Sequence, residues 1–257
     1  MTNRASAAAA SRSSSRTEDG TAPAPRKRRG GGAPMHTRER LIQASIELFN
    51  RHGVPNVSLS QIAAAVGISQ GNLTYHFKKR DDLVFAAFLV LEERMRDALL
   101  PKALSPEDPD DAAAVLLKIV RTFWEFRFLF NSLTHLLSQD PRLKDAYFAF
   151  QEEMLYDIEV TNAARMDKGF LLPMQKNNTM RLLADNMWTQ WLGWLRWQQI
   201  HNPEVQMPNG DALYDCARHH WSLMRPYLKD EFAEKLLANY QRILKPKVKV
   251  EKAAKRK

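Results

Sequence analysis

The stretch SLSQIAAAVGISQGNLTYHF, residues 58–77, reads as two short helices separated by a bend. Ser58 and Gln61 have the spacing of a capping box, in which each side chain bonds the other residue's backbone N–H at a helix start. Gly67 ends this helix, because glycine readily adopts the conformation that follows a helix C-terminus. Ser69 is placed to cap the next helix. The pattern therefore predicts a helix–turn–helix.

Helical patterns flank this stretch on both sides. Thr37 is the predicted N-cap of a first helix, whose apolar residues recur at helical spacing and which stops at Gly53. Asp81 and Asp82 open a fourth helix that extends to about residue 100, because carboxylates are favourable at the positive end of a helix dipole. The stretch is thus the centre of a small helical module.

The rest of the chain is helical in period after a linker at 103–110, and no segment alternates polar and apolar residues for long enough to form a strand. The predicted helices cover about 111–137, 141–158, 160–170, 178–201, 210–224 and 229–243. We therefore predict an all-α fold of about nine or ten helices. A three-helix helix–turn–helix domain at 35–83 would precede a larger helical domain at 84–244.

The net charge of +9 is concentrated at the two ends of the chain. Residues 1–34 carry +5 and have almost nothing to bury, so we expect a disordered basic arm. Residues 245–257 carry +6 and form a basic C-terminal tail. The predicted helix–turn–helix domain carries +2, which leaves −4 on residues 84–244. This distribution favours an acidic partner such as DNA at one end, although an arm without any role is an alternative.

Other classes of site lack support in the sequence. The single cysteine, Cys216, excludes an intrachain disulfide and a multi-cysteine metal site, and we expect it to be a buried small side chain. His219 and His220 are adjacent, so on a helix they point about 100° apart and cannot share one metal ion. We expect both at the surface or at an interface, and we predict no metal site.

The motifs of catalysis and of membrane insertion do not occur. There is no phosphate-binding glycine loop, nucleophile elbow or HExxH pattern, so we predict no enzyme activity and no cofactor. No stretch has the continuous apolar run of a secretory signal or a membrane-spanning helix. We therefore expect a cytoplasmic protein that makes no membrane contact.

The side chains of the second helix of the motif suit base recognition. In a helix–turn–helix this helix lies in the major groove of DNA, where only residues near its N-terminus and on one face reach the base edges. Gln70 and Asn72 carry amides that can pair with adenine, while Thr74 offers a hydroxyl and a methyl group. Gly71 lets the backbone approach the duplex. The competing interpretation is a helical hairpin of some other bundle, with these polar residues merely solvated.

Phosphate contacts are expected around this face, where they position a protein without specifying sequence. Ser58 and Ser60 lie at a helix N-terminus, which is an anion site, and Lys79 extends outward at the distal end. The complete set of predicted DNA-binding residues is Ser58, Ser60, Ser69, Gln70, Gly71, Asn72, Thr74, Tyr75, His76, Lys79 and Arg80.

The module has a specific resemblance to a known family. Residues 37–83, with LIQASIELFNRHG, IAAAVGIS and GNLTYHFKKRDDL, resemble the N-terminal domain of the TetR family of bacterial transcriptional regulators. Many members have tyrosine where this chain has Thr74 and lysine where it has Arg80, so Tyr75 is the candidate to replace the tyrosine contact. Residues 123–150 look like the C-terminal domain of one TetR branch.

The resemblance implies a homodimer that binds a palindromic double-stranded DNA operator. The last long helices, 178–201 and 210–224, would pack into a four-helix bundle between subunits, with 229–243 as an additional candidate. A small-molecule effector in the C-terminal domain would change the spacing of the two DNA-binding heads. We therefore expect a repressor released by its effector; an activator is an alternative, and the operator and effector stay undetermined.

Four tryptophans lie three residues apart in the expected helix 178–201. Each step of three rotates by about 300°, so Trp188, Trp191, Trp194 and Trp197 drift through about 180° and cannot all face one site. We expect one edge of the helix to face the subunit's own core and another to face the partner. Burial of all four within one chain is the alternative.

An apolar cavity in the C-terminal domain is the second implication of the resemblance. Aromatic residues, among them Phe123 and Phe130, would line it, and a few polar side chains would orient the ligand. The predicted pocket residues are Trp124, Phe126, Arg127, Phe128, Asn131, His135, Phe148, Met154, Asn186 and Trp188. Aromatic residues at helical spacing are also typical of plain core.

Two other classes of protein compete with a ligand-responsive regulator. An architectural DNA-binding protein without an effector would use the basic tails and show a steep salt dependence with weak sequence preference. A helical enzyme with an accessory DNA-binding head is the other, but no paired acid and base residues at a useful spacing support it.

Overall fold

The computed structural model describes residues 36–99 and 109–244. The predicted basic arm, most of the linker and the basic tail lie outside the described residues. The elements are α1 (Thr37–His52), η1 (Val54–Asn56), α2 (Leu59–Val66), α3 (Gln70–His76), α4 (Arg80–Leu99), α5 (Pro109–Glu125), α6 (Arg127–Asn131), α7 (Leu133–Gln139), α8 (Pro141–Asp167), α9 (Met180–His201), α10 (Gly210–Met224), η2 (Arg225–Tyr227) and α11 (Asp230–Leu244). In this part of the chain the fold is all-α, as predicted, with one isolated bridge between Leu171 and Leu228.

The local signals around the bend act as expected. The Ser58 backbone N–H donates to Gln61 Oε1 at 2.8 Å, and the Gln61 N–H donates to Ser58 Oγ at 3.3 Å, which completes the capping box of α2. Gly67 has φ +77° and ψ 34°, the left-handed conformation that ends the helix. Ser69 Oγ then accepts the Asn72 N–H at 3.2 Å and starts α3. The helix–turn–helix is confirmed.

The start of α1 differs by one residue from the prediction. Thr37 is the first helical residue, and the N-cap is His36, whose backbone N–H donates to Glu39 Oε2 at 3.2 Å. The acidic side chain in the first turn satisfies one of the N–H groups that every helix start leaves free. The predicted end of the helix at Gly53 is confirmed.

The predicted helix 111–137 is wrong, because the chain leaves helical geometry twice within it. The first break is at Phe126, with φ −103° and ψ 25°, and the second is at Ser132. The Asn50 amide group on α1 donates to Glu125 O at 2.6 Å and accepts the Phe128 N–H at 3.0 Å. In a continuous helix these two backbone groups would bond to other groups of the same helix. Here they bond to Asn50 instead, so a tertiary contact stabilises the break.

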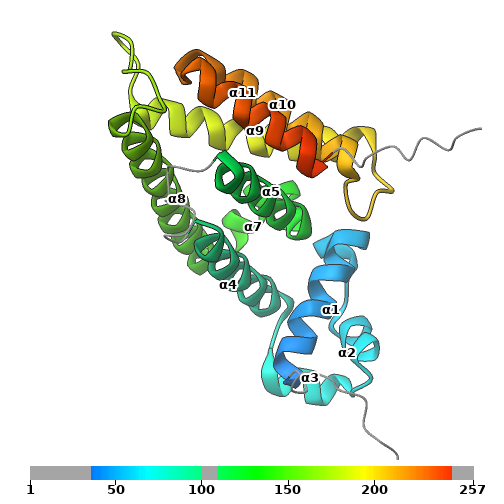
Figure 1. The fold of residues 1–257 in the computed structure, drawn as a ribbon. Coiled ribbons are helices and arrows are strands. Elements are labelled where there is room, and N and C mark those ends of the chain that lie inside the picture. Colours follow the sequence, from blue (N-terminus) through cyan, green and yellow to red (C-terminus); the bar gives the residue numbers. More distant parts are fainter. Residues whose placement is uncertain (1–35, 100–108, 245–257) are drawn as a thin grey trace, which may run out of the picture. The chain divides into compact units, whose positions relative to one another are not determined.

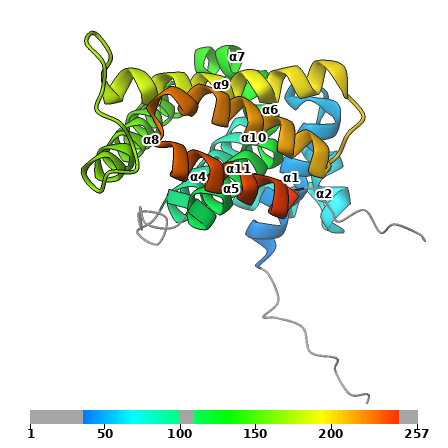
Figure 2. The same ribbon diagram turned by 45° about the horizontal axis from the view of Figure 1, so that its top comes forward.

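The predicted helices 141–158 and 160–170 are one helix, α8, which ends before Gly169 at φ +76°. In Figure 1, α8 descends along one side of the drawing, and α9 and α10 extend across its upper part. α8 packs on α9, α9 on α10 and α10 on α11, while α5 packs on both α4 and α11. Figure 2 gives a second view of α9, α10 and α11 beside α5.

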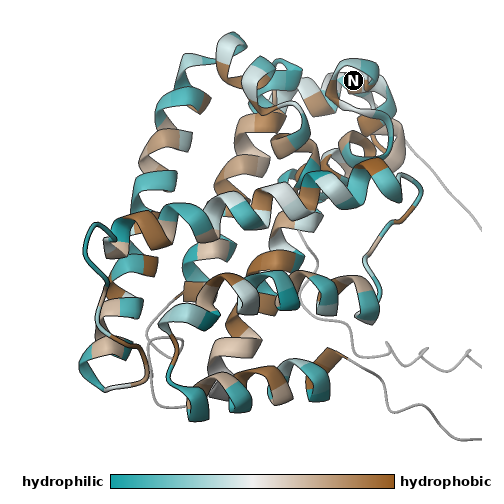
Figure 3. Ribbon diagram, turned by 90° about the horizontal axis from the view of Figure 1, so that it is seen from above, coloured by the Kyte–Doolittle hydropathy of each residue, from teal (hydrophilic) through white to brown (hydrophobic). Residues whose placement is uncertain are grey.

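Apolar residues of each helix turn toward the shared interior. Figure 3 shows hydrophobic and hydrophilic segments following one another along most helices, as expected for amphipathic helices in a layered bundle. α4 contacts α1 as well as α5 and α8, so it belongs both to the N-terminal helices and to the larger helical part. The predicted domain boundary at residue 83 lies inside this helix.

Two glycine substitutions test the backbone assignment. Gly67→Ala should lower the free energy of unfolding by about 1–2 kcal/mol, because an L-residue at positive φ is strained even though no atom lies within 4 Å of the added Cβ. Gly71→Ala is the matched control: its position is helical and its Cβ would lie 3.9 Å from Ser69 Oγ, so stability should rise by about 0.5–1 kcal/mol. Urea denaturation measures both. Equal stability of the two variants would contradict the left-handed turn.

Candidate functional site

The outer face of α3 is polar and open. Leu73 and Phe77 are buried beneath it, whereas the Tyr75 ring is 86% exposed. Eight predicted DNA-binding residues are exposed: Ser58, Ser60, Ser69, Gln70, Gly71, Asn72, Tyr75 and Lys79. Thr74, His76 and Arg80 are half-buried. The structure therefore leaves the predicted base-reading amides of Gln70 and Asn72 exposed at the start of α3.

Some of these groups already have partners within the chain. Thr74 Oγ1 donates to Gly71 O at 2.9 Å, and the Ser58 and Ser60 hydroxyls lie 2.9 Å apart. Arg80 Nη1 donates to Pro55 O at 3.0 Å, which ties the start of α4 to the segment before α2. Arg80 therefore has a positioning contact that the sequence did not indicate.

Three other basic residues of this region were not among the predicted DNA-binding residues. Lys78 is exposed beside Lys79 and belongs to the same basic run. Arg40 Nη2 donates to Val66 O at 2.6 Å, which fixes the end of α2 against α1. The Arg38 guanidinium lies 5.1 Å from the centre of the Phe77 ring. The signal for Lys78 was present in the KKR run, but the two arginine contacts depend on how α1 packs.

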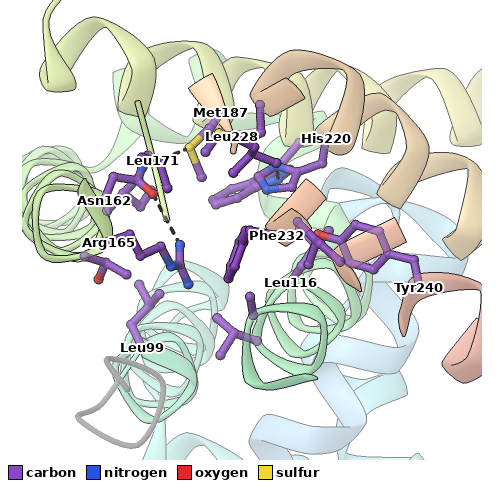
Figure 4. Close-up of a pocket in the computed structure, with 17 residues that line it drawn as sticks. Leu99, Leu116, Asn162, Arg165, Leu171, Met187, His220, Leu228, Phe232 and Tyr240 are labelled. Carbon is purple, nitrogen blue, oxygen red and sulfur yellow. Dashed lines mark hydrogen bonds between the residues drawn. The ribbon is translucent and has the colours of Figure 1, made fainter. Parts of the chain in front are cut away.

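A second candidate site is a cavity of about 50 Å³ among α4, α5, α8, α9, α10 and α11 (Figure 4). Most of its wall is apolar, and this part includes Leu99, Leu116, Met187, Met224, Phe232 and Leu236. Thr161, Asn162, Arg165, His220 and Tyr240 supply the polar groups. A largely apolar cavity with a few convergent polar groups is typical of a small-molecule site.

Two pairs of polar groups in the cavity wall are hydrogen-bonded. Arg165 Nη1 donates to Asn162 Oδ1 at 3.2 Å, and one of the dashed lines in Figure 4 marks this bond. Trp191 Nε1 donates to His220 Nδ1 at 3.3 Å, with the two rings stacked at 5.7 Å between centroids. Because Nδ1 accepts, the proton of the neutral imidazole is assigned to Nε2.

Burial sets the charge state of these groups. Together with the weaker effect of the positive charge of Arg165, it lowers the pKa of His220 to about 3, so the imidazole is neutral near pH 7. Burial raises the pKa of the Tyr240 hydroxyl, which stays protonated. Burial also lowers the pKa of Arg165, but a guanidinium stays charged in proteins. The cavity wall thus carries a positive charge.

None of the ten predicted pocket residues lines this cavity. Trp124, Phe126, Arg127, Phe128, Met154 and Trp188 are buried in the core, whereas Asn131, His135, Phe148 and Asn186 are exposed. Because the helix breaks at Phe126, the aromatic residues of 123–130 do not share one helix face. Phe128 packs on Phe49, with centroids 5.2 Å apart, and Arg127 stacks on Trp124. The structure does not gather these ten residues around one space.

Two expectations for α10 have different outcomes. Cys216 is buried, as predicted, and burial raises the pKa of its thiol to about 12. His219 is exposed, but the prediction of a surface or interface position is wrong for His220, which is 7% exposed and lines the cavity. His220 points inward because its ring stacks on Trp191 of α9. The residues next to His220 in the sequence do not indicate this contact.

The tryptophans of α9 separate as their spacing requires. Trp188, Trp191 and Trp194 are buried within the chain, and Trp197 is 58% exposed. Trp191 alone among these four reaches the cavity. The predicted drift around the helix is confirmed, and the exposed position falls near the C-terminal end of α9.

Comparison with known proteins identifies the relationship. A family model described as bacterial transcriptional repressor matches residues 90–236, which is more than half of the chain. The N-terminal model of bacterial regulatory proteins of the tetR family matches residues 41–87. The chain belongs to the TetR family.

Individual relatives agree with this assignment. A TetR-family transcriptional regulator from Marinobacter aquaeolei VT8 has 29% identity and a TM-score of 0.69 over 81% of this chain and 98% of its own. A putative regulator from Saccharomonospora viridis in complex with choline has 16% identity, a TM-score of 0.59 and coverage of 75% and 97%, so it supports the fold alone. The HTH-type regulator AcrR of Shigella flexneri is 32% identical over 29% of this chain and 35% of its own.

The matches to curated relatives are partial, because the chain spans less than half the length of the first of them. The family is one of transcriptional regulators. Across residues 36–99 and 109–244, no helix is both long and apolar enough to cross a membrane. The same residues contain no group of three or more histidine, cysteine or acidic side chains that could hold a metal ion.

The buried histidine gives this TetR-family protein a predictable response to acid. An unfolded histidine gains its proton below about pH 6.5, whereas folded His220 does so only near pH 3. Acidification therefore favours the unfolded state, and the wild type should lose about 2 kcal/mol relative to His220→Gln between pH 6.5 and 5. Urea unfolding across this range measures the difference. His219→Gln, at an exposed site, is the control and should follow the wild type.

Proposed function

We propose that this TetR-family protein is a homodimeric transcriptional regulator of the bacterial cytoplasm that binds a palindromic double-stranded DNA operator, and that a small molecule releases it. The observation that carries the proposal is the outer face of α3, where Gln70 and Asn72 are exposed on a helix fixed from beneath by Leu73 and Phe77. A helix held in this way can present its side chains to the major groove without losing its own core.

The exposed residues divide into two roles. Gln70, Asn72 and Thr74 are proposed to read base edges, since amides and hydroxyls match the donor and acceptor pattern there. Ser58, Ser60, Ser69, His76 and Lys79 are proposed to contact phosphates, with Tyr75 as the exposed aromatic contact. The half-buried Arg80 is proposed to contact phosphate with its remaining N–H groups, because one N–H already donates to Pro55 O. Gly71 leaves room for close approach of the backbone.

Substitution of the two amides should remove specificity. Selection from a random DNA pool should first yield a palindrome, and Gln70→Ala and Asn72→Ala should then each reduce discrimination between this palindrome and random duplex by about 1–3 kcal/mol. Lys79→Ala is the control, because loss of a phosphate contact should weaken both duplexes alike and lower the salt slope by about 1. Fluorescence anisotropy at several salt concentrations measures all three.

Unchanged discrimination in both amide variants would mean that α3 does not read bases. Selection of no sequence at all would favour an architectural DNA-binding protein.

The exposed face of α9 supports the proposed dimer. Leu182, Gly193, Trp197 and Ile200 fall within about 60° of one another around the helix. Leu182 is 44% exposed, Trp197 58% and Ile200 62%, which is unusual for large apolar side chains that follow one line. Gly193 has open space where a Cβ would lie, so a second helix can approach closely there. We propose that this face meets its counterpart, together with α10, in the partner subunit.

Charges placed on this face should separate the subunits. The double variant Trp197→Glu and Ile200→Glu should weaken dimerisation by roughly 100-fold or more, because each unpaired buried carboxylate costs several kcal/mol. Analytical ultracentrifugation measures the effect, and operator affinity should fall with it. Tyr156→Glu, on an exposed position of α8, is the control and should remain dimeric. If the double variant stays dimeric and Tyr156→Glu becomes monomeric, the interface lies on α8 instead.

The effector is proposed to act through α5, which reaches from the cavity to α1. Leu116 of α5 lines the cavity, and Glu125 at its end is bonded through its carbonyl to Asn50 and through its carboxylate to Arg94 of α4. A ligand that prefers one position of α5 would shift the population of head positions by its differential affinity. The choline-bound neighbour supports the fold alone, so its ligand is not carried over.

A further inference from the structure

The cavity contains a positive charge for which the described residues provide no negative partner. The Arg165 side chain makes its one hydrogen bond in this part of the structure to the neutral amide of Asn162, and its Nε is buried without any partner. No carboxylate of the described residues forms an ion pair with it. Arg165 is half-buried overall, and a charge that is largely withdrawn from water without a counter-charge is costly, so its presence needs a reason beyond stability.

A second polar group at the same wall also lacks a partner. Thr161 is 9% exposed, lies one turn before Arg165 on α8, and its Oγ1 has no hydrogen bond. Residues four apart on a helix lie on the same face, so this hydroxyl and the guanidinium belong to one surface. Two free donors, one of them charged, match the needs of an anion.

We infer that the ligand of this cavity is a small apolar carboxylic acid, bound as its anion with the carboxylate on Arg165 and the carbon chain against the opposite wall. The inference rests on the proposed effector function and names the ligand class of the same cavity. A guanidinium presents parallel N–H groups that a carboxylate accepts two at a time, an arrangement that a neutral or cationic ligand cannot reproduce.

The other polar groups are consistent with this choice. His220 is neutral and its Nδ1 accepts the Trp191 N–H, so it adds no second charge to the cavity wall. Tyr240 lines the same cavity, and its hydroxyl is protonated and able to donate. In Figure 4, Arg165 extends from the α8 side toward Phe232, and Tyr240 lies beyond Phe232. A carboxylate would therefore lie at the α8 wall, with the carbon chain among the apolar residues of the other helices.

The size of the cavity favours a small ligand. A volume of about 50 Å³ holds roughly four water-sized groups. Met187 and Met224 line it, and unbranched methionine side chains can move to admit a few more atoms. The apolar wall argues against inorganic phosphate, which needs polar partners on all sides. Monocarboxylates of about four to six carbons fit these limits.

Calorimetric titration of the full-length protein without DNA tests the ligand class. Butanoate and hexanoate should bind, the size-matched amides should bind about tenfold more weakly or worse, and hexylamine should not bind. Arg165→Gln should lose acid binding by about tenfold or more, with Arg165→Lys in between. Arg121→Gln, which removes an exposed arginine of α5, should bind as the wild type does.

A thermal melt of the ligand-free variants separates a binding role from a structural one. Arg165→Gln should melt at the same temperature as the wild type or a few degrees higher, because it removes an uncompensated charge from the cavity wall. A large loss of stability would show that another part of the chain neutralises Arg165 and would overturn the inference. Equal binding of acid and amide, unchanged binding by Arg165→Gln, or preference for inorganic phosphate would also overturn it.

The proposed function can fail separately. If the acids bind in calorimetry but leave operator binding unchanged, the ligand class stands and the effector role falls. If operator binding is specific and an amide or amine, rather than an acid, releases it, the regulator stands and the carboxylate inference falls.

Discussion

The short helix α3 is stable only because its inner face is buried. A helix of seven residues is too short to be stable alone in water, since the cost of its first turn is not offset by so few hydrogen bonds. Leu73 and Phe77 anchor α3 in the core, Ser69 caps it, and Gly67 sets the angle at which it leaves α2. These contacts fix the position of every polar group on the outer face.

The larger helical part shows the opposite relation between polarity and burial. Its interior admits a guanidinium, an amide, a hydroxyl and an imidazole into a wall that is otherwise apolar. Arg165 and Thr161 remain short of partners among the described residues, whereas Trp191 and His220 satisfy each other. Incomplete satisfaction of buried polar groups lowers stability, so each such group in a folded protein calls for an explanation, of which a functional role is one.

Local sequence predicted the head better than it predicted the cavity. Ser58, Gln61 and Gly67 act within a few residues of one another, so their spacing alone specifies the capping box and the turn. The cavity needs Arg165 from α8, His220 from α10 and Phe232 from α11, and nothing in their separate sequences shows that the three helices converge. The aromatic run at 123–130 was expected at a pocket, but the chain turns at Phe126 and buries these rings elsewhere.

The hydrogen bonds of Asn50 attach α1 to the end of α5 and the start of α6. Its amide group bonds the Glu125 carbonyl and the Phe128 N–H, both of which are main-chain atoms. Main-chain atoms are present whatever side chains α5 and α6 carry. Mutations that reshape the α5 wall of the cavity therefore leave this attachment intact, so the lining of the cavity can change while α1 stays bonded to the same two main-chain positions.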